Sequence, residues 1–241
     1  MYIVKFRTVL RGLVLTLLMA AGIMILMYSA RHHTVVPTFT ALPWEACVLL
    51  DAGHGGEDGG AVSQNGTVEA TINLAITRKT EALMGFLGVR ARLTRSDESS
   101  LDYTAGAPTR TNKAADLNAR LRLAQNAPQL DFVSIHMNKF GQEKYYGAQV
   151  FYSPNAPESK TLAEYMQARL RSTLDPDNAR VCKPSPDGVM LMKYIKSPAV
   201  TVECGFLSNQ AEEEKLRSDL YQTKVAIAIT CGYIDYLEMR N

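Results

Sequence analysis

From Ala46 onward, short apolar runs rich in β-forming residues alternate with helical patterns, and this alternation limits the fold more than any other feature. The apolar runs are mostly continuous, which is typical of strands covered on both faces of a sheet. Such runs occupy residues 47–50, 89–94, 132–136, 148–152, 189–192 and 199–203. Apolar residues at helical spacing occupy residues 68–86, 114–126, 158–174 and 219–237. This order predicts an α/β domain with a mostly parallel sheet and right-handed crossovers.

Residues 12–30 are apolar and carry no charge. A stretch of this length is close to the ~20 residues that a helix needs to cross a bilayer. Lys5, Arg7 and Arg11 precede it, and the positive-inside rule places such residues in the cytoplasm, so that the domain that follows is exported. We favour an uncleaved anchor, because a signal peptide has a shorter apolar region and a small residue where Tyr28 stands. A cleaved signal peptide is the alternative, and it exports the domain as well.

Residues 31–45 contain Pro37 and Pro43 and show no periodicity, as expected of a tether. We therefore divide the chain into a signal-anchor at 1–30, the tether, and a folded domain at 46–241. Beyond residue 30 the chain carries 23 basic and 24 acidic residues. This balance gives no positive field to hold a nucleic acid backbone, and we expect no nucleic acid partner.

The four cysteines are scattered and have no CxxC spacing, at Cys47, Cys182, Cys204 and Cys231. Four cysteines in a chain of 241 residues do not form the dense disulfide framework of a small secreted protein. We expect buried free thiols rather than a structural zinc site.

Three of the predicted strands end in residues that carry chemistry. His54 follows the first strand by three residues, His136 ends the strand at 132–136, and Glu203 ends the strand at 199–203. Open α/β sheets bind ligands at the carboxyl ends of their strands. Apart from two histidines in the tether, His54 and His136 are the only histidines of the chain. Their meeting at one sheet edge therefore points to a functional site.

Two imidazoles and one carboxylate suit zinc, and a catalytic zinc site keeps three protein ligands and one open position. His54 and His136 would supply two of the ligands, and Glu57, Asp58 and Glu69 are candidates for the third. We favour Glu69, at the start of a predicted helix, because the glycines between it and His54 let the chain fold back. Glu57 and Asp58 are alternatively solvated turn residues, and the two histidines could pack at the sheet edge without a metal.

Glu203 ends an apolar strand, and burial beside a metal would make it a general base. Its alternative role is a structural carboxylate that accepts backbone N–H bonds. Cys204 points to the opposite face of the strand, so we expect it in the core rather than as a nucleophile. Residues 96–113 form a polar loop that either borders a binding groove or is a passive surface segment.

A series of motifs runs along residues 47–237: DAGHGGEDGGA, Glu69 followed by Asn73-Leu74, LTR at 93–95, Arg120 with Asn126, DFVSIHMN, GAQVFY and PAVTVECGFLSN. In these motifs, several of them in the same order and spacing, the chain resembles the zinc-dependent N-acetylmuramoyl-L-alanine amidases of the amidase 3 family. The resemblance is greatest to the germination-specific members of spore-forming bacteria, because of the N-terminal apolar segment, the GVMLMK stretch and the lack of wall-binding repeats.

The resemblance implies a twisted six-stranded sheet flanked by helices, zinc ligands at His54, Glu69 and His136, and Glu203 as the catalytic carboxylate. It implies hydrolysis of the amide between N-acetylmuramic acid and L-alanine of the peptidoglycan stem peptide. In the germination-specific branch, this step precedes formation of muramic-δ-lactam in the spore cortex. Asn138 and Arg95 become candidate groove residues, each with an equally good structural interpretation.

The expected location is the outer face of the cytoplasmic membrane, which in a spore former is the intermembrane or cortex space. Two histidines and one carboxylate on Gly-rich flanks also suggest weak zinc affinity and an accessory protein that helps load the metal. Two other functions stay open at this point. One is a catalytically degenerate peptidoglycan-binding or scaffold protein, and the other is a different exported zinc peptidase.

Overall fold

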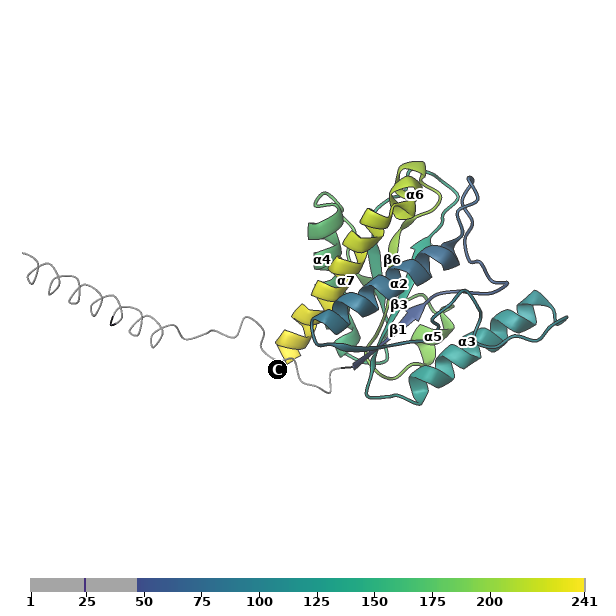
Figure 1. The fold of residues 1–241 in the computed structure, drawn as a ribbon, viewed down its shortest axis with the longest axis horizontal. Coiled ribbons are helices and arrows are strands. Elements are labelled where there is room, and N and C mark those ends of the chain that lie inside the picture. Colours follow the sequence, from purple (N-terminus) through teal and green to yellow (C-terminus); the bar gives the residue numbers. More distant parts are fainter. Residues whose placement is uncertain (1–23, 25–46, 241) are drawn as a thin grey trace, which may run out of the picture. The chain divides into compact units, whose positions relative to one another are not determined.

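Six strands form one sheet in the order β2-β1-β3-β6-β4-β5. The computed structural model describes residue 24 and residues 47–240 (Figure 1). Every neighbouring pair of strands is parallel except β4 and β6, which run antiparallel, so the predicted mostly parallel sheet is confirmed. The strands are β1 (Cys47–Ala52), β2 (Arg90–Leu93), β3 (Asp131–Asn138), β4 (Gln149–Tyr152), β5 (Lys183–Pro184) and β6 (Ala199–Phe206).

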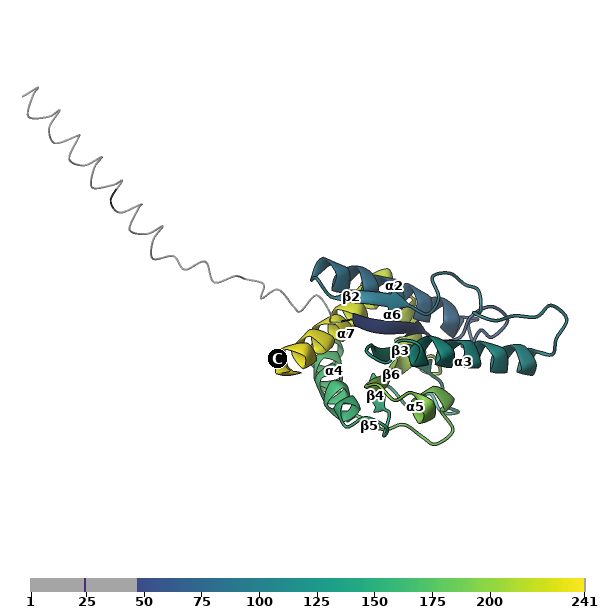
Figure 2. The ribbon, with the colours of Figure 1, turned by 90° about the horizontal axis from the view of Figure 1, so that it is seen from below.

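Helices cover both faces of the sheet, as continuous apolar strands require. One side carries α4 and α7, and the other carries α3 and α5 (Figure 2). The helices are α2 (Glu69–Phe86), α3 (Thr109–Gln125), α4 (Glu158–Leu174), α5 (Met190–Tyr194), α6 (Gln210–Arg217) and α7 (Asp219–Arg240). α2 and α4 both pack against α7, which joins these three helices into one layer.

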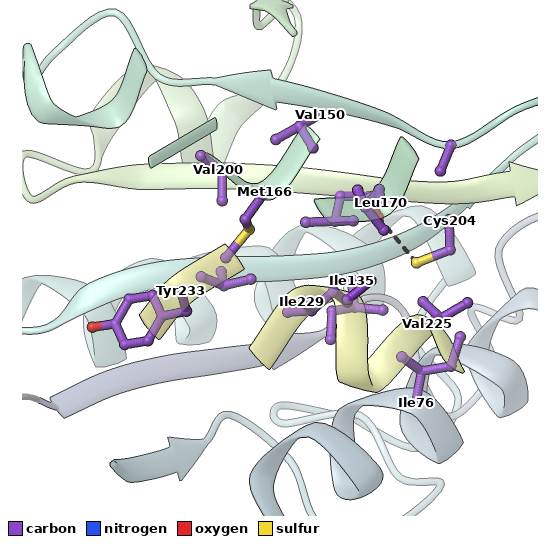
Figure 3. Close-up of a cluster of buried hydrophobic side chains, with 14 of the residues drawn as sticks. Ile76, Ile135, Val150, Met166, Leu170, Val200, Cys204, Val225, Ile229 and Tyr233 are labelled. Atoms are coloured by element: carbon purple, nitrogen blue, oxygen red, sulfur yellow. Dashed lines mark hydrogen bonds between the residues drawn. The ribbon is translucent and has the colours of Figure 1, made fainter. Parts of the chain in front are cut away.

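The larger core cluster lies between the sheet and this layer (Figure 3). Ile76 of α2, Met166 of α4 and Ile229 of α7 are fully buried against Ile135 of β3. Cys204 is also fully buried there, which confirms that its side chain points into the core. A smaller cluster on the opposite face packs α3 and α5 against the sheet. Removing any of the larger side chains would cost about 2–5 kcal/mol, because a cavity would remain.

The three cysteines whose side chains the structure describes are free. Of these, Cys204 is buried as predicted, whereas Cys182 and Cys231 are half-buried. The prediction of buried thiols is therefore correct for one of the three.

One predicted strand is wrong. Residues 190–192 belong to the single-turn helix α5 and Val189 is its N-cap, with Lys193 N donating to Val189 O and Ile195 N to Leu191 O. A run of four apolar residues fits either a strand or a helix, and burial of Leu191 and Met192 explains its apolar character. The fifth strand is instead β5, at Lys183–Pro184.

The start of one helix and the existence of another also differ from the sequence prediction. α3 begins at Thr109, so it includes the last five residues of the predicted loop at 96–113. α6 was not predicted, although Asn209 caps it by accepting a hydrogen bond from Glu212 N. An Asn followed three residues later by Glu is a known helix-start signal.

The predicted anchor at 1–30 and tether at 31–45 lie outside the described residues, apart from residue 24. The chain divides into two units, Met1–Ala41 and Leu42–Asn241. Within residue 24 and residues 47–240, no helix combines the length and the apolar character needed to span a bilayer.

Candidate metal centre and catalytic site

The turn after β1 is held by two buried arginines. Arg120 of α3 donates hydrogen bonds to the carbonyl oxygens of Ala52 and His54, at 2.7 and 2.6 Å. Arg95 donates to the carbonyl oxygens of Ala52 and Gly53, at 2.9 and 3.1 Å. His54 adopts φ +63°, a left-handed conformation that is unfavourable for a residue with a side chain. These bonds fix an otherwise strained turn, and of the two interpretations of Arg95 they favour the structural one.

The Nδ1 atom of His54 lies 2.8 Å from Oδ2 of Asp58. Asp58 also forms an ion pair with Lys113 of α3 at 3.1 Å. Burial raises the pKa of Asp58, but the hydrogen bond to His54 lowers it by more than burial raises it. The pKa of Asp58 therefore lies well below its ordinary value. An ionised carboxylate only accepts hydrogen bonds, so Nδ1 of His54 carries a proton, and Nε2 is the nitrogen left to face Glu69 and a metal. Asp58 is therefore an orienting residue rather than a solvated turn residue.

Glu69 is the first residue of α2 and is 3% exposed. Its Oε2 atom accepts a hydrogen bond from Ala61 N at 2.7 Å, and its Oε1 atom accepts one from Met137 N at 3.1 Å. The first turn of a helix favours a negative charge, which adds to these two bonds. Together they hold the carboxylate in one orientation, with Oε1 directed at both histidines.

The side chains of His54, Glu69 and His136 converge at the carboxyl ends of β1 and β3. Oε1 of Glu69 lies 3.4 Å from Nε2 of His54 and 3.0 Å from Nδ1 of His136. One ligand atom from each of the three residues lies within 4.8 Å of the other two. Ligands about 2 Å from a tetrahedral zinc ion lie roughly 3.4 Å apart, which is close to these separations. The donor set and its geometry therefore fit a divalent metal such as zinc.

Two glycines leave room for these ligands. A Cβ atom at Gly53 would lie 2.2 Å from Cε1 of His136. A Cβ atom at Gly60 would lie 2.6 Å from both Oε2 of Glu69 and Cδ2 of His54. Gly60 also has φ +71°, which favours glycine by itself. Glycine at positions 53 and 60 is thus required by close packing around the cluster.

Within the cluster, the negative charge of Glu69 favours a positive charge on His54, and the reverse also holds. Burial lowers the pKa of His54, but hydrogen bonds to Asp58 and Glu69 outweigh it and raise this pKa to about 9. Burial raises the pKa of Glu69, but hydrogen bonds to His136 and His54 bring it far below its usual range. A metal cation held by Nε2 of His54 would take the place of the proton on that nitrogen and keep the favourable interaction with Glu69.

Glu203 lies on β6, in register with His136 on the neighbouring strand β3. Its Oε2 atom is buried and has no hydrogen-bond partner among the described residues. Burial raises the pKa of Glu203 to about 7, while His136 opposes this shift. A partly buried carboxylate with a free oxygen and a pKa near neutrality is suited to exchange protons with a substrate or a water molecule. The alternative role, in which Glu203 accepts backbone N–H bonds, has no such bond to support it among these residues.

A cavity of about 460 Å³ opens beside Glu203 and His136. It lies over β3, β4 and β6 and is walled by α5, with Leu117 of α3 at one side. Asn138 lines it, as expected of a groove residue, whereas Arg95 does not. The sequence did not indicate the α5 residues of the wall, because they come from the segment that was predicted as a strand, and it gave no signal for Ser185, which precedes that segment.

Glu57 accepts a hydrogen bond from the hydroxyl of Tyr103 at 2.8 Å. Glu57, Asp58 and Tyr103, together with residues of α3, line a small depression that shares no lining residue with the cavity. Tyr103 lies within the predicted polar loop, so this loop borders the site at that point. The orienting role of Asp58 had one sequence signal, its separation of four residues from His54 within a Gly-rich turn.

Comparison with known proteins identifies relatives of this chain. A sequence model of the N-acetylmuramoyl-L-alanine amidase family matches residues 48–234. The germination-specific N-acetylmuramoyl-L-alanine amidase of Bacillus subtilis (strain 168) is 33% identical over 189 residues, which cover 78% of this chain and 78% of that protein.

Two solved structures that resemble the domain are at least 30% identical to it in sequence. The CwlD amidase from Clostridioides difficile, solved in complex with the GerS lipoprotein, is 42% identical with a TM-score of 0.77, over 80% of this chain and 99% of that chain. The catalytic domain of CwlV, an N-acetylmuramoyl-L-alanine amidase from Bacillus (Paenibacillus) polymyxa var. colistinus, is 30% identical with a TM-score of 0.65. That match covers 80% of this chain and 98% of that chain.

Proposed function

The chain belongs to the N-acetylmuramoyl-L-alanine amidase family, and we propose that it is a zinc-dependent member that acts on spore-cortex peptidoglycan. It is a cell-wall amidase, which cleaves the amide between N-acetylmuramic acid and L-alanine of the stem peptide. The observation that carries the zinc proposal is the convergence of His54, Glu69 and His136, with Glu203 in register beside His136.

In this proposal Nε2 of His54, Nδ1 of His136 and Oε1 of Glu69 hold the zinc ion. A bound zinc ion supplies Lewis acidity, which polarises the substrate carbonyl and makes water more acidic. Asp58 keeps the proton of His54 on Nδ1, so that Nε2 faces the metal. Ala61 N and Met137 N prevent Glu69 from rotating away.

Glu203 moves the proton in the proposed reaction. Its carboxylate accepts a proton from the attacking water as the C–O bond forms at the amide carbon. The same carboxyl group then donates this proton to the amide nitrogen, and the C–N bond breaks. The products are the free lactyl carboxylate of the glycan and a stem peptide with a free L-alanine amine.

The proposal is tested by incubating the full chain with peptidoglycan, with added zinc and with a chelator, and by identifying the products by mass. Release of whole stem peptides that stops with chelator and returns with zinc is the expected result. Release without zinc would overturn the metal assignment. Cleavage within the stem peptide would instead indicate a peptidase, and chelator-insensitive wall binding without release would indicate a scaffold protein.

The spore-cortex role rests on two relatives. The Bacillus subtilis relative is named as germination-specific, and the CwlD amidase shares 42% of its residues over almost its whole length. We expect the chain to restore muramic-δ-lactam to the cortex of spores that lack their own germination-specific amidase. Spores complemented with the chain and still without muramic-δ-lactam would contradict this role.

We also propose that the domain is exported and anchored by residues 12–30, and that an accessory protein assists zinc loading. The location follows from the uncharged apolar stretch preceded by Lys5, Arg7 and Arg11. Protease added outside intact cells should degrade the domain but spare a cytoplasmic marker protein. The accessory protein is suggested by the CwlD complex with a lipoprotein. Calorimetry that shows tight zinc binding by the chain alone would remove the need for it.

A further inference from the structure

A buried carboxylate outside the metal cluster holds the turn that leads into α2 (residues 61–68, the entry turn). Glu213 of α6 is only 3% exposed, and a charged side chain is seldom buried without partners. Its Oε1 atom accepts hydrogen bonds from the hydroxyls of Ser63 and Thr67, both at 2.6 Å. Its Oε2 atom accepts a hydrogen bond from Nδ2 of Asn65 at 2.9 Å. Three side chains of the entry turn thus converge on one carboxylate from a distant part of the sequence.

Hydrogen bonds also close the entry turn on itself. Ser63 N donates to Thr67 O at 3.0 Å, and Val62 and Val68 form an antiparallel bridge. Oγ of Ser63 accepts hydrogen bonds from the backbone N–H groups of Asn65 and Thr67, at 3.2 and 3.0 Å. The entry turn is therefore one unit, and a contact at its tip restrains its base as well.

The base of the entry turn holds a predicted metal ligand. Ala61 N donates to Oε2 of Glu69 at 2.7 Å, and Ala61 O accepts a hydrogen bond from Glu69 N at 2.9 Å. The other carboxylate oxygen of Glu69, Oε1, is the one directed at His54 and His136. A shift of Ala61 would therefore rotate or release the carboxylate that faces both histidines.

α6 gives Glu213 a rigid base. Leu216, three residues further along the helix, is fully buried in the larger core cluster. Glu212 accepts hydrogen bonds from Gly147 N and Phe206 N, at 2.9 and 2.8 Å, and Phe206 is the last residue of β6. α6 is thus anchored both to the core and to the end of β6, so Glu213 is a fixed point for the entry turn.

We propose that Glu213 is a positioning residue for the metal site, which holds Glu69 through the entry turn in the orientation that binds zinc. The contacts run from Glu213 to the tip of the entry turn, and from its base at Ala61 to Glu69. A ligand that is already held in place loses less conformational freedom when the metal binds, so such contacts increase metal affinity. This inference rests on the proposed zinc site and adds a residue of α6 that determines its affinity.

The test compares three variants of α6 in the full chain. Glu213→Ala removes all three side-chain bonds to the entry turn. Glu213→Gln keeps an oxygen for the two hydroxyl groups and gives up only the bond from Asn65. Glu214→Ala is the matched control, because Glu214 is the neighbouring exposed acid of the same helix. Calorimetry measures zinc affinity, and the visible absorption of the cobalt(II)-loaded chain reports the geometry of the site.

For Glu213→Ala we expect zinc affinity to fall by about 10–100-fold, as it does when an outer contact of a metal ligand is lost. The cobalt(II) absorption should also change, because Glu69 is no longer held in one orientation. Glu213→Gln should keep zinc affinity within about threefold of that of the unmodified chain, since it loses a single bond to the exposed Asn65. Glu214→Ala should change neither the affinity nor the absorption.

A second readout needs no metal. Hydrogen exchange at the N–H group of Ala61 measures how often its bond to Glu69 opens. We expect Glu213→Ala to speed this exchange by about tenfold and Glu213→Gln to slow it again. Tyr233→Phe is a control for overall stability, because it removes a hydrogen bond to the buried Asp131 at the other end of the strands. It should neither speed exchange at Ala61 nor weaken zinc binding.

Unchanged zinc affinity in Glu213→Ala, or equal losses in Glu213→Ala and Tyr233→Phe, would overturn the proposal. Should Glu213→Ala fail to fold, Thr67→Val decides by the same criteria. This variant removes one bond from the side of the turn, and zinc binding about fivefold weaker is expected. Failure of the zinc proposal gives a different result, because the unmodified chain would then bind no zinc. Exchange at Ala61 still tests the role of Glu213 in that case.

Discussion

Asp58 accepts a hydrogen bond from Nδ1 of His54 at 2.8 Å and thereby determines which nitrogen of that imidazole faces Glu69. The two residues are separated by four positions in the Gly-rich turn, and Lys113 reaches Asp58 from α3. The turn, the helix and the metal cluster are connected through this single carboxylate. A residue that contacts no substrate can thus control the affinity of the site for its metal.

We predict that Asp58→Asn lowers zinc affinity by about 10–100-fold, because a neutral amide no longer fixes the imidazole or increases its basicity. Zinc affinity is measured by calorimetry on the full chain. Glu57→Gln is the matched control, since Glu57 is the neighbouring exposed acid and contacts Tyr103 rather than a cluster residue. Equal zinc affinities for the two variants would show that Asp58 does not orient His54.

The second prediction concerns Glu203. Replacement by Gln keeps the size of the side chain but removes its ability to accept a proton, so turnover should fall by about 10²–10⁴-fold. Zinc affinity should persist, because Glu203 is not part of the three-residue cluster. The rate of stem peptide release and zinc binding are measured together. Glu164→Gln, an exposed acid on α4, should leave both unchanged. Full turnover by Glu203→Gln would exclude Glu203 from proton transfer.

The ends of three strands could be predicted to share an edge, since a parallel sheet brings its carboxyl ends together. This placed His54, His136 and Glu203 in one region from the sequence alone. Glu69 could be favoured because glycines permit a return of the chain toward His54. The contacts that orient these side chains could not be predicted, because they come from loop backbone, as in the bond from Ala61 N to Glu69.

The cavity could not be predicted from the sequence either. Its wall is α5, one turn of helix, and four apolar residues do not distinguish a helix from a strand. The role of Arg95 could not be decided from the sequence. A basic residue after a strand fits a binding groove, yet all the described hydrogen bonds of Arg95 go to backbone carbonyl oxygens, those of Ala52, Gly53, Ala70 and Asp97.

The third prediction concerns the buried ion pair of Asp51 and Arg120, which anchors α3 to β1. Asp51→Asn should lower the free energy of unfolding by about 3 kcal/mol, because the charge of Arg120 loses a buried partner. The exposed pair of Asp102 and Arg122, at 3.3 Å, is a matched control, and Asp102→Asn should cost less than about 0.5 kcal/mol. Urea unfolding at pH 7 measures both. Equal costs would show that burial does not strengthen the Asp51 pair.

The effect of Asp51→Asn should also depend on pH. Burial raises the pKa of Asp51, but Arg120 and hydrogen bonds from Ser134 and Thr94 lower it below its usual value. A carboxylate with a lowered pKa stabilises the folded chain above its unfolded pKa of about 3.9, and this stabilisation is lost as pH falls through the folded pKa. The difference in unfolding free energy between the two proteins should be constant from pH 7 to 5 and shrink below about pH 4. A difference that grows on acidification would contradict a lowered pKa.

The fourth prediction compares a glycine that is tightly packed against a metal-site histidine with a glycine that has open space around it. A methyl group at Gly53 would lie 2.2 Å from Cε1 of His136, so Gly53→Ala must displace this imidazole and should abolish measurable zinc binding. Gly85 is exposed within α2, and a Cβ there meets no atom within 4 Å. Gly85→Ala should therefore leave zinc binding intact and stabilise the helix by about 0.5–1 kcal/mol, because alanine is the better helix former. Calorimetry and thermal unfolding of both variants test the pair, and unimpaired zinc binding by Gly53→Ala would show that His136 does not need its observed position to bind the metal.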